Sequence, residues 1–242
     1  MEGRNPVLEA LRSSLPVSRV TFAAGLRPDR TLDEIERLAA EAGAVVTRSP
    51  REALDRRSER GGHQGVIAEV APYVYAELDP VLTSAEGSAT SLLVALDHVL
   101  DPGNLGAVAR SAEVAGAGAL IVPRRRSAPV TAAAHKAAAG ALAYLPVVRV
   151  TNLARALKEV KRHGYWVAGA SQDAERTVWE SPMEGRLCIV LGGEGTGLSR
   201  LVEETCDFTV RLPVAGRVDS LNVAQAATAL AFEWVRRTAQ GS

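Results

Sequence analysis

Short apolar runs in the second part of the chain constrain the fold more than any other feature. From residue 91 onward, runs of strand length alternate with stretches of helical character. Strands that are apolar on both faces and separated by helices are typical of a parallel sheet between two helical layers. We therefore predict an α/β fold with a parallel sheet. Its strands are expected at Leu92–Leu96, Ala119–Val122, Val147–Val150, Trp166–Ala170, Leu187–Leu191 and Phe208–Leu212.

A smaller α/β unit is expected before this sheet. The segment that follows it carries Pro72 and Pro80, which are typical of a linker. We therefore predict a first domain over 1–71, a linker over 72–89 and a second domain over 90–242. The helices of the first domain are predicted near 5–12, 32–42 and 51–54, and its strands near 17–23, 44–47 and 65–70.

The charge balance restricts the class of partner. Lys plus Arg and Asp plus Glu both number 28, so the net charge is zero and only a local patch can attract nucleic acid. Such a patch is expected at Arg124–Arg126, with Lys136 and Arg217. It can bind RNA phosphates, or it can be an ordinary solvated surface.

The two cysteines, Cys188 and Cys206, have no metal-ligand spacing with each other or with the four histidines. We expect two buried thiols and no metal site. The first residues include Glu2 and Arg4 and lack the apolar stretch of a secretory signal. No apolar run reaches the ~18 residues that a membrane span needs. A cytoplasmic protein without a membrane segment is therefore predicted.

A glycine-rich run, Gly192–Gly197, follows one of the apolar strands. It is not a Walker phosphate loop, because Leu198 and Ser199 stand where that loop needs Lys and then Ser or Thr. It also lacks the spacing of the dinucleotide fingerprint. Glycine has no Cβ and tolerates positive φ, so the run predicts a loop that a ligand can approach closely.

Two further loops have compositions that indicate binding. Asp101–Gly106 follows the first strand of the sheet and leads into a helix that carries Arg110, and Pro213–Asn222 precedes a long apolar helix. Ligands of open parallel sheets bind outside the carboxyl ends of the strands. We therefore expect a site where these loops and the glycine-rich run lie.

These segments, in this order, resemble the TrmH-like SpoU branch of the SPOUT superfamily, the RNA ribose 2′-O-methyltransferases. The matching stretches are Asp101–Arg110, Ile189–Leu198 and Leu212–Ala224. Gly3–Arg12 and His63–Val66 resemble the small ribosomal-protein-like domain that binds substrate in many members. The resemblance spans the chain and is greatest for the group that methylates a guanosine ribose of 23S ribosomal RNA.

The resemblance implies a cofactor and an assembly. Family members bind S-adenosylmethionine (AdoMet) in a deep trefoil knot formed by the C-terminal segment, and they need no metal. They work as homodimers whose active site lies near the subunit interface. The positions that match the family's cofactor contacts are Gly192, Leu212 and Leu221.

Five more positions match the family residues closest to the chemistry: Asn104, Arg110, Glu194, Ser220 and Asn222. A guanidinium with a pKa above ~12 hardly deprotonates. We therefore expect Arg110 to position a phosphate and to stabilise the developing alkoxide, while another group or water takes the proton. Glu194 is expected to orient Arg110 or the ribose, or simply to face a helix dipole. Asn104, Ser220 and Asn222 can instead cap helices, or can cap a helix and act in the site together.

Two other functions remain open at this stage. A non-catalytic RNA-binding or ribosome-assembly factor can have the same fold, although it need not keep Arg110, Glu194, Ser220 and Asn222 together. A related enzyme that modifies tRNA, or a resistance methyltransferase acting on another ribosomal nucleotide, would carry the same motifs. The first domain favours ribosomal RNA by analogy only.

Overall fold

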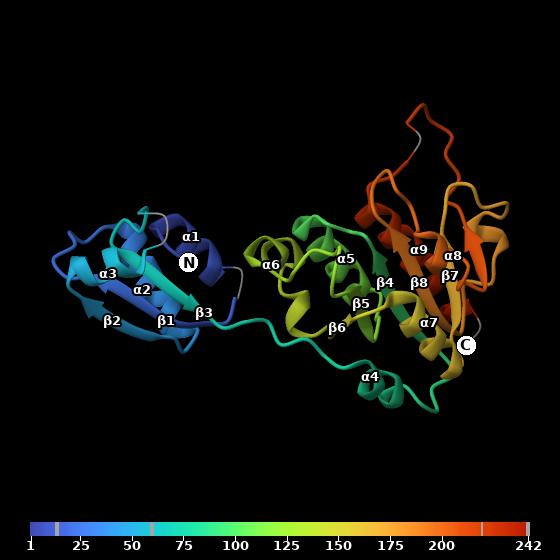
Figure 1. The fold of residues 1–242 in the computed structure, drawn as a ribbon, viewed down its shortest axis with the longest axis horizontal. Helices are drawn as coiled ribbons and strands as arrows, with labels where there is room; N and C mark the ends of the chain where they lie inside the picture. Colours follow the sequence, from blue (N-terminus) through green and yellow to red (C-terminus); the bar gives the residue numbers. More distant parts are fainter. Residues whose placement is uncertain (13–14, 59–60, 219, 241–242) are drawn as a thin grey trace. The chain divides into compact units, whose positions relative to one another are not determined.

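The chain divides into two compact units, Met1–Val74 and Tyr75–Ser242, each with its own sheet (Figure 1). No helix among the described residues is long and apolar enough to cross a membrane. The structure is a computed structural model that describes residues 1–12, 15–58, 61–218 and 220–240.

In its described residues, the first unit contains a three-stranded sheet and three helices. Its elements are α1 (Arg4–Arg12), β1 (Val17–Ala23), α2 (Arg30–Glu41), β2 (Val45–Ser49), α3 (Arg51–Arg57) and β3 (Val66–Val70). The central strand β1 pairs parallel with β2 and antiparallel with β3. Val20, Ile35 and Leu54 are fully buried in this unit. The predicted small α/β unit is confirmed.

The second unit is built on a six-stranded sheet. The strands are β4 (Ser91–Asp97), β5 (Ala119–Pro123), β6 (Val147–Val150), β7 (Trp166–Ala170), β8 (Arg186–Gly192) and β9 (Phe208–Val210). Their order is β6-β5-β4-β8-β7-β9, and every neighbouring pair is parallel. The predicted parallel α/β sheet is confirmed. The two central strands, β4 and β8, end level with each other, because Asp97 pairs with Gly192.

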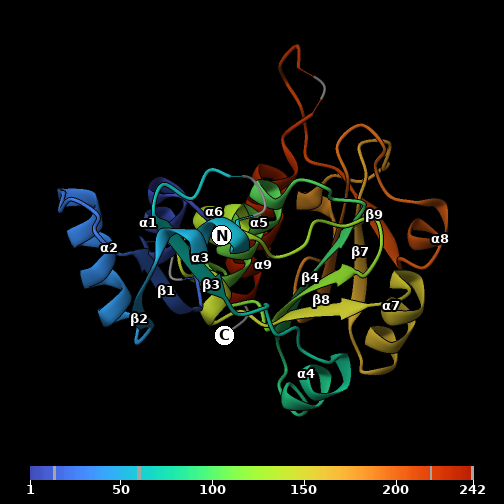
Figure 2. The same cartoon turned by 60° about the vertical axis from the view of Figure 1, so that its left-hand side comes forward.

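Helices cover both faces of this sheet (Figures 1 and 2). On one face, Leu82 and Leu157 pack against Leu93 and Val190 of the central strands. On the other face α5 and α9 pack against each other, and Ser111 and Thr228 share a hydrogen bond of 2.6 Å between their hydroxyl groups. The helices are α4 (Leu78–Ser84), α5 (Pro102–Val114), α6 (Ala132–Ala138), α7 (Leu153–Arg162), α8 (Arg200–Glu203) and α9 (Val223–Gln240), with single turns at Ala141–Ala143 and Val178–Glu180.

The segment 72–89 differs from the linker that was predicted there. It contains helix α4, and Leu82 of this helix is fully buried in the core of the second unit. Pro80 lies in the first turn of the helix, where the backbone N–H groups have no helical partner and proline is therefore tolerated. That the first domain binds the substrate and the second transfers the methyl group stays a prediction.

The two cysteines differ in burial, although both were expected to be buried. Cys188 lies on β8 and has no exposed surface, and burial raises the pKa of its thiol. Cys206 is only partly buried, and the same effect raises its pKa to about 12. Both thiols are free.

Candidate active site

The candidate site lies where β4 and β8 end at the centre of the sheet. Because these strands are parallel and in register, the loops that follow them emerge side by side. The loop after β4 leads into α5, whose first turn is capped by Asp101 through its carboxylate and the Asn104 N–H, 2.9 Å apart. The glycine-rich run follows β8. The structure therefore brings the first two predicted loops together.

The glycine-rich run folds back on itself. The Gly197 N–H donates to the Gly193 carbonyl at 3.0 Å, and Gly195 and Gly197 have φ values of 75° and 61°. A Cβ on Gly192 would lie 2.1 Å from the Gly197 carbonyl carbon. Such contacts admit no side chain, so the tight loop requires glycine at this position.

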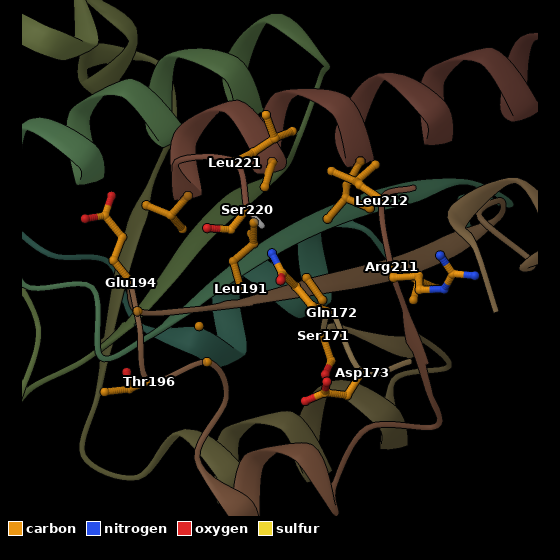
Figure 3. Close-up of a pocket in the computed structure, with 18 of the residues that line it drawn as sticks. Ser171, Gln172, Asp173, Leu191, Glu194, Thr196, Arg211, Leu212, Ser220 and Leu221 are labelled. Atoms are coloured by element: carbon orange, nitrogen blue, oxygen red, sulfur yellow. The ribbon is translucent and has the colours of Figure 1, made fainter. Parts of the chain in front are cut away.

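A cavity of about 400 Å³ opens beside this loop (Figure 3). Leu191, Leu212 and Leu221 supply apolar walls, and Ser171 and Asp173 lie across the cavity from Leu212 and Leu221. Apolar side chains therefore face polar ones across the cavity, and Ser220 and Arg211 lie beside the leucines. The lining residues are Ala170–Asp173, Leu191–Gly197, Val210–Leu212, Val214, Ser220, Leu221, Val223, Ala226 and Leu230.

Three of the predicted catalytic residues contact one another beside the cavity. Asn104 Nδ2 donates to Glu194 Oε1 at 3.1 Å, and Asn222 Nδ2 donates to the same oxygen at 2.7 Å. Asn222 Nδ2 also lies 2.9 Å from Asn104 Oδ1. We call Asn104, Glu194 and Asn222 the amide–carboxylate cluster. It joins the loops after β4 and β8 to the start of α9.

The capping alternatives are resolved for two of these residues. Asn222 Oδ1 accepts the Ala224 N–H at 2.9 Å, so Asn222 holds the start of α9 and belongs to the cluster as well. Asn104 does not cap α5, because Asp101 has that role. One side chain can thus stabilise a helix end and a site together.

The remaining predicted site residues lie outside the amide–carboxylate cluster. Gly192, Leu212, Ser220 and Leu221 line the cavity. Arg110 is exposed on α5, and its guanidinium makes no hydrogen bond or ion pair with any described residue. In particular, Glu194 contacts the two asparagines and not Arg110.

The polar side of the cavity includes residues that lie outside the family motifs. Ser171, Gln172 and Asp173 directly follow β7, which lies next to β8 in the sheet. Their position after an apolar strand could have indicated them, because ligands bind at the carboxyl ends of such strands. Among the described residues, no group of three or more His, Cys, Asp or Glu is placed to hold a metal ion.

Two protein-family models match the chain. Residues 91–232 match the SpoU rRNA Methylase family. Residues 1–76 match a domain described as RNA 2′-O ribose methyltransferase substrate binding. The cavity and the amide–carboxylate cluster lie within the first of these matches.

Similar proteins cover nearly the whole chain. An uncharacterized tRNA/rRNA methyltransferase from Mycolicibacterium vanbaalenii is 44% identical over 236 residues, which are 97% of this chain and 75% of that protein. The crystal structure of the SpoU methyltransferase AviRb from Streptomyces viridochromogenes aligns with a TM-score of 0.70 and 27% identity, over 100% of this chain and 90% of that one. The same protein in complex with the cofactor AdoMet aligns with a TM-score of 0.69 and 26% identity, over 98% and 89% of the two chains.

Proposed function

Because this chain belongs to the SpoU family of RNA methyltransferases, we propose that it methylates a ribose 2′-hydroxyl of 23S ribosomal RNA, at a guanosine. It is an RNA methyltransferase that uses AdoMet. The observation that carries the proposal is the amide–carboxylate cluster beside a cavity of cofactor size. The guanosine and the ribosomal substrate rest on the resemblance of the motifs.

The residues of the cavity fit AdoMet. About 400 Å³ lies within the usual range for small-molecule pockets. Leu212 and Leu221 would pack against the adenine, and the close-packed backbone at Gly192 would form the floor. Asp173 offers a carboxylate to the cationic part of the cofactor. When bound, AdoMet supplies an electrophilic methyl group on a positively charged sulfur.

Arg110 is proposed to bind the RNA and to stabilise the attacking oxygen. Its guanidinium is free of described protein partners, so its donors are available to a phosphate and to the developing alkoxide. A group that stays protonated cannot take the proton of the 2′-hydroxyl. That proton leaves through another group or through water.

Glu194 is proposed to fix the two asparagines. Its Oε1 accepts from both amides, and this arrangement orients the loops after β4 and β8 and the start of α9 before substrate arrives. A site that is ordered in advance loses less free energy when the reacting atoms are aligned.

Removing the Glu194 acceptor is expected to slow methyl transfer more than removing its charge. Glu194→Ala should lower kcat by about 30-fold, because the Asn104 amide loses its acceptor and the Asn222 amide loses one of two, whereas Glu194→Gln should cost less than about fivefold, because an oxygen acceptor remains. Single-turnover assays with labelled AdoMet measure both rates. The control is Glu203→Ala, which removes one exposed carboxylate on α8. A Glu194→Ala rate equal to that of the control would contradict the assigned role.

Arg124–Arg126 form a candidate surface for the RNA backbone, which we call the arginine loop. All three residues are exposed, and no described residue binds their guanidinium groups. The loop is anchored through the Arg124 N–H to the Val150 carbonyl at 2.7 Å and through the Ala128 N–H to the Val99 carbonyl at 2.8 Å. It therefore lies beside the segment that leads from β4 to Asn104.

Replacing the arginine loop by three alanines is expected to weaken RNA binding and its dependence on salt. Each lost phosphate contact lowers the slope of log affinity against log salt by about 0.7 to 0.9. Fluorescence anisotropy with a 23S RNA fragment over a KCl series measures the slope. A matched triple variant, Arg155→Ala with Lys158→Ala and Arg162→Ala, removes the same charge from exposed positions on α7. Equal slopes for the two variants would contradict the assignment.

The substrate is tested by transfer of tritiated methyl groups from AdoMet. Total ribosomal RNA and tRNA from a strain that lacks the gene are offered in parallel, and the alkali-resistant linkage is mapped. A 2′-O-methylguanosine in 23S RNA is the expected product. Labelled tRNA, or a different ribosomal nucleotide, would replace the substrate named here. Absence of AdoMet binding in calorimetry would favour a non-catalytic RNA-binding factor.

We also propose a homodimer, located in the cytoplasm, with the C-terminal segment knotted as in the family. Leu100, Val218 and Leu221 are large apolar side chains that remain exposed around the site loops, which supports a partner surface there. Light scattering coupled to gel filtration measures the mass in solution, and a monomer at micromolar concentration would contradict the dimer.

A further inference from the structure

Asp97, at the end of β4, binds the backbone at Ser199, just after the glycine-rich run. Its side chain is buried, with 3% of the residue exposed, and its Oδ2 accepts the Ser199 N–H at 2.7 Å. Its Oδ1 lies 2.6 Å from His98 Nδ1, where the ring nitrogen is the donor to the carboxylate. Both oxygens of a buried carboxylate are therefore engaged, and one of them holds the backbone of the neighbouring loop.

The backbone of His98 packs closely against Gly193, at the start of the same loop. A Cβ on Gly193 would lie 2.4 Å from the His98 carbonyl oxygen, so this carbonyl sits directly on the glycine. His98 reaches this position with a φ of 60°, a left-handed conformation that is unusual outside glycine.

The loop between these two contacts carries the functional groups. It presents Glu194 to Asn104 and Asn222, and its backbone lines the cavity from Gly193 to Gly197. An apolar side chain in place of Asp97 would fill the same space but would leave the Ser199 N–H without an acceptor. The Asp97 carboxylate thus holds the position of Ser199, and the loop before Ser199 determines the position of Glu194.

We propose that Asp97 is a positioning residue for methyl transfer, acting through the loop 193–199 and Glu194. This inference rests on the proposed function for its effect on catalysis. Its structural half concerns the loop alone, which can be measured without RNA. The two halves are therefore tested separately.

The structural half is tested by amide hydrogen exchange. In Asp97→Ala the Ser199 N–H loses its acceptor, so peptides that cover 193–199 should exchange about tenfold faster or more. Asp97→Asn keeps an oxygen acceptor for the Ser199 N–H and should exchange nearly as slowly as the wild type. Peptides from β5 report whether the sheet is intact. Unchanged exchange at 193–199 in Asp97→Ala would overturn the proposal.

A second variant breaks the contact from the other side. Ser199→Pro removes the N–H that Asp97 accepts, and the φ of −69° at Ser199 suits proline. Its loop should exchange as fast as that of Asp97→Ala. Ser199→Ala is the matched control, because it keeps the N–H and loses only a hydroxyl that makes no capping bond. This pair gives an answer even if Asp97→Ala fails to fold.

The catalytic half is tested by a double-mutant cycle with Glu194→Ala. If Asp97 acts through Glu194, Asp97→Ala should lower kcat about tenfold in the wild-type background and less than about twofold in Glu194→Ala. Asp97→Asn should restore most of the rate. If Asp97→Ala lowered kcat by the same factor with and without Glu194→Ala, the two residues would act independently. That result would overturn the role of Asp97 through Glu194. A wild-type enzyme that transfers no methyl group to RNA would overturn the proposed function instead, and the exchange results would stand.

Discussion

Replacing Arg110 by lysine is expected to lower the rate of methyl transfer by about 100-fold, with AdoMet affinity kept within about twofold. The guanidinium has no described partner within the chain, so its loss removes nothing that shapes the cavity. Lysine keeps the positive charge but not the planar pair of donors that can hold a phosphate and face an alkoxide. Single-turnover assays give the rate, and calorimetry gives the affinity.

Arg155→Lys is the matched control, because Arg155 is exposed on α7 and lies outside the site. A near-wild-type rate for Arg110→Lys would remove Arg110 from the mechanism. A large loss of AdoMet affinity would mean that Arg110 acts on the cofactor cavity and not on the RNA.

Replacing Gly192 by alanine is expected to abolish measurable AdoMet binding, a loss of about 100-fold or more in affinity. The new Cβ would lie 2.1 Å from the Gly197 carbonyl carbon and 2.5 Å from the Leu198 nitrogen. Both are backbone atoms, so the loop has to open, and its atoms line the cavity. Calorimetric titration with AdoMet measures the loss.

Gly216→Ala is the control for this change. Gly216 has no atom within 4 Å of the position where a Cβ would stand, and its φ is not positive. Its AdoMet affinity should stay within about twofold of the wild type. If Gly192→Ala bound AdoMet with wild-type affinity, the glycine-rich run would not form a wall of the cofactor site.

The strands were predictable because their evidence is local. Each predicted run of the second unit overlaps a strand of the sheet, since burial on both faces leaves a continuous apolar stretch in the sequence. Helix α4 was missed for the opposite reason. Pro72 and Pro80 are typical of a linker, and the burial of Leu82 that stabilises the helix depends on residues far away in the chain.

The site was only partly predictable. The sequence supplied Asn104, Glu194 and Asn222 through the family motifs, but not the hydrogen bonds that join them. Its position after an apolar strand marked Asp173 as a possible ligand contact, but local sequence could not show that β7 lies beside β8, which brings Asp173 to this cavity. Asp97 was not predicted either, because its contact with the loop after β8 depends on the register between β4 and β8, which are far apart in sequence.

The contact between Asn104 and Asn222 joins residues 118 positions apart in the chain. Closing so long a stretch carries a large entropic cost, so contacts of this kind are expected to form late in folding. Because Asn222 also starts α9, the site is completed only when that helix docks. A newly synthesised chain would therefore gain activity only after α9 has been made and has docked beside the earlier loops.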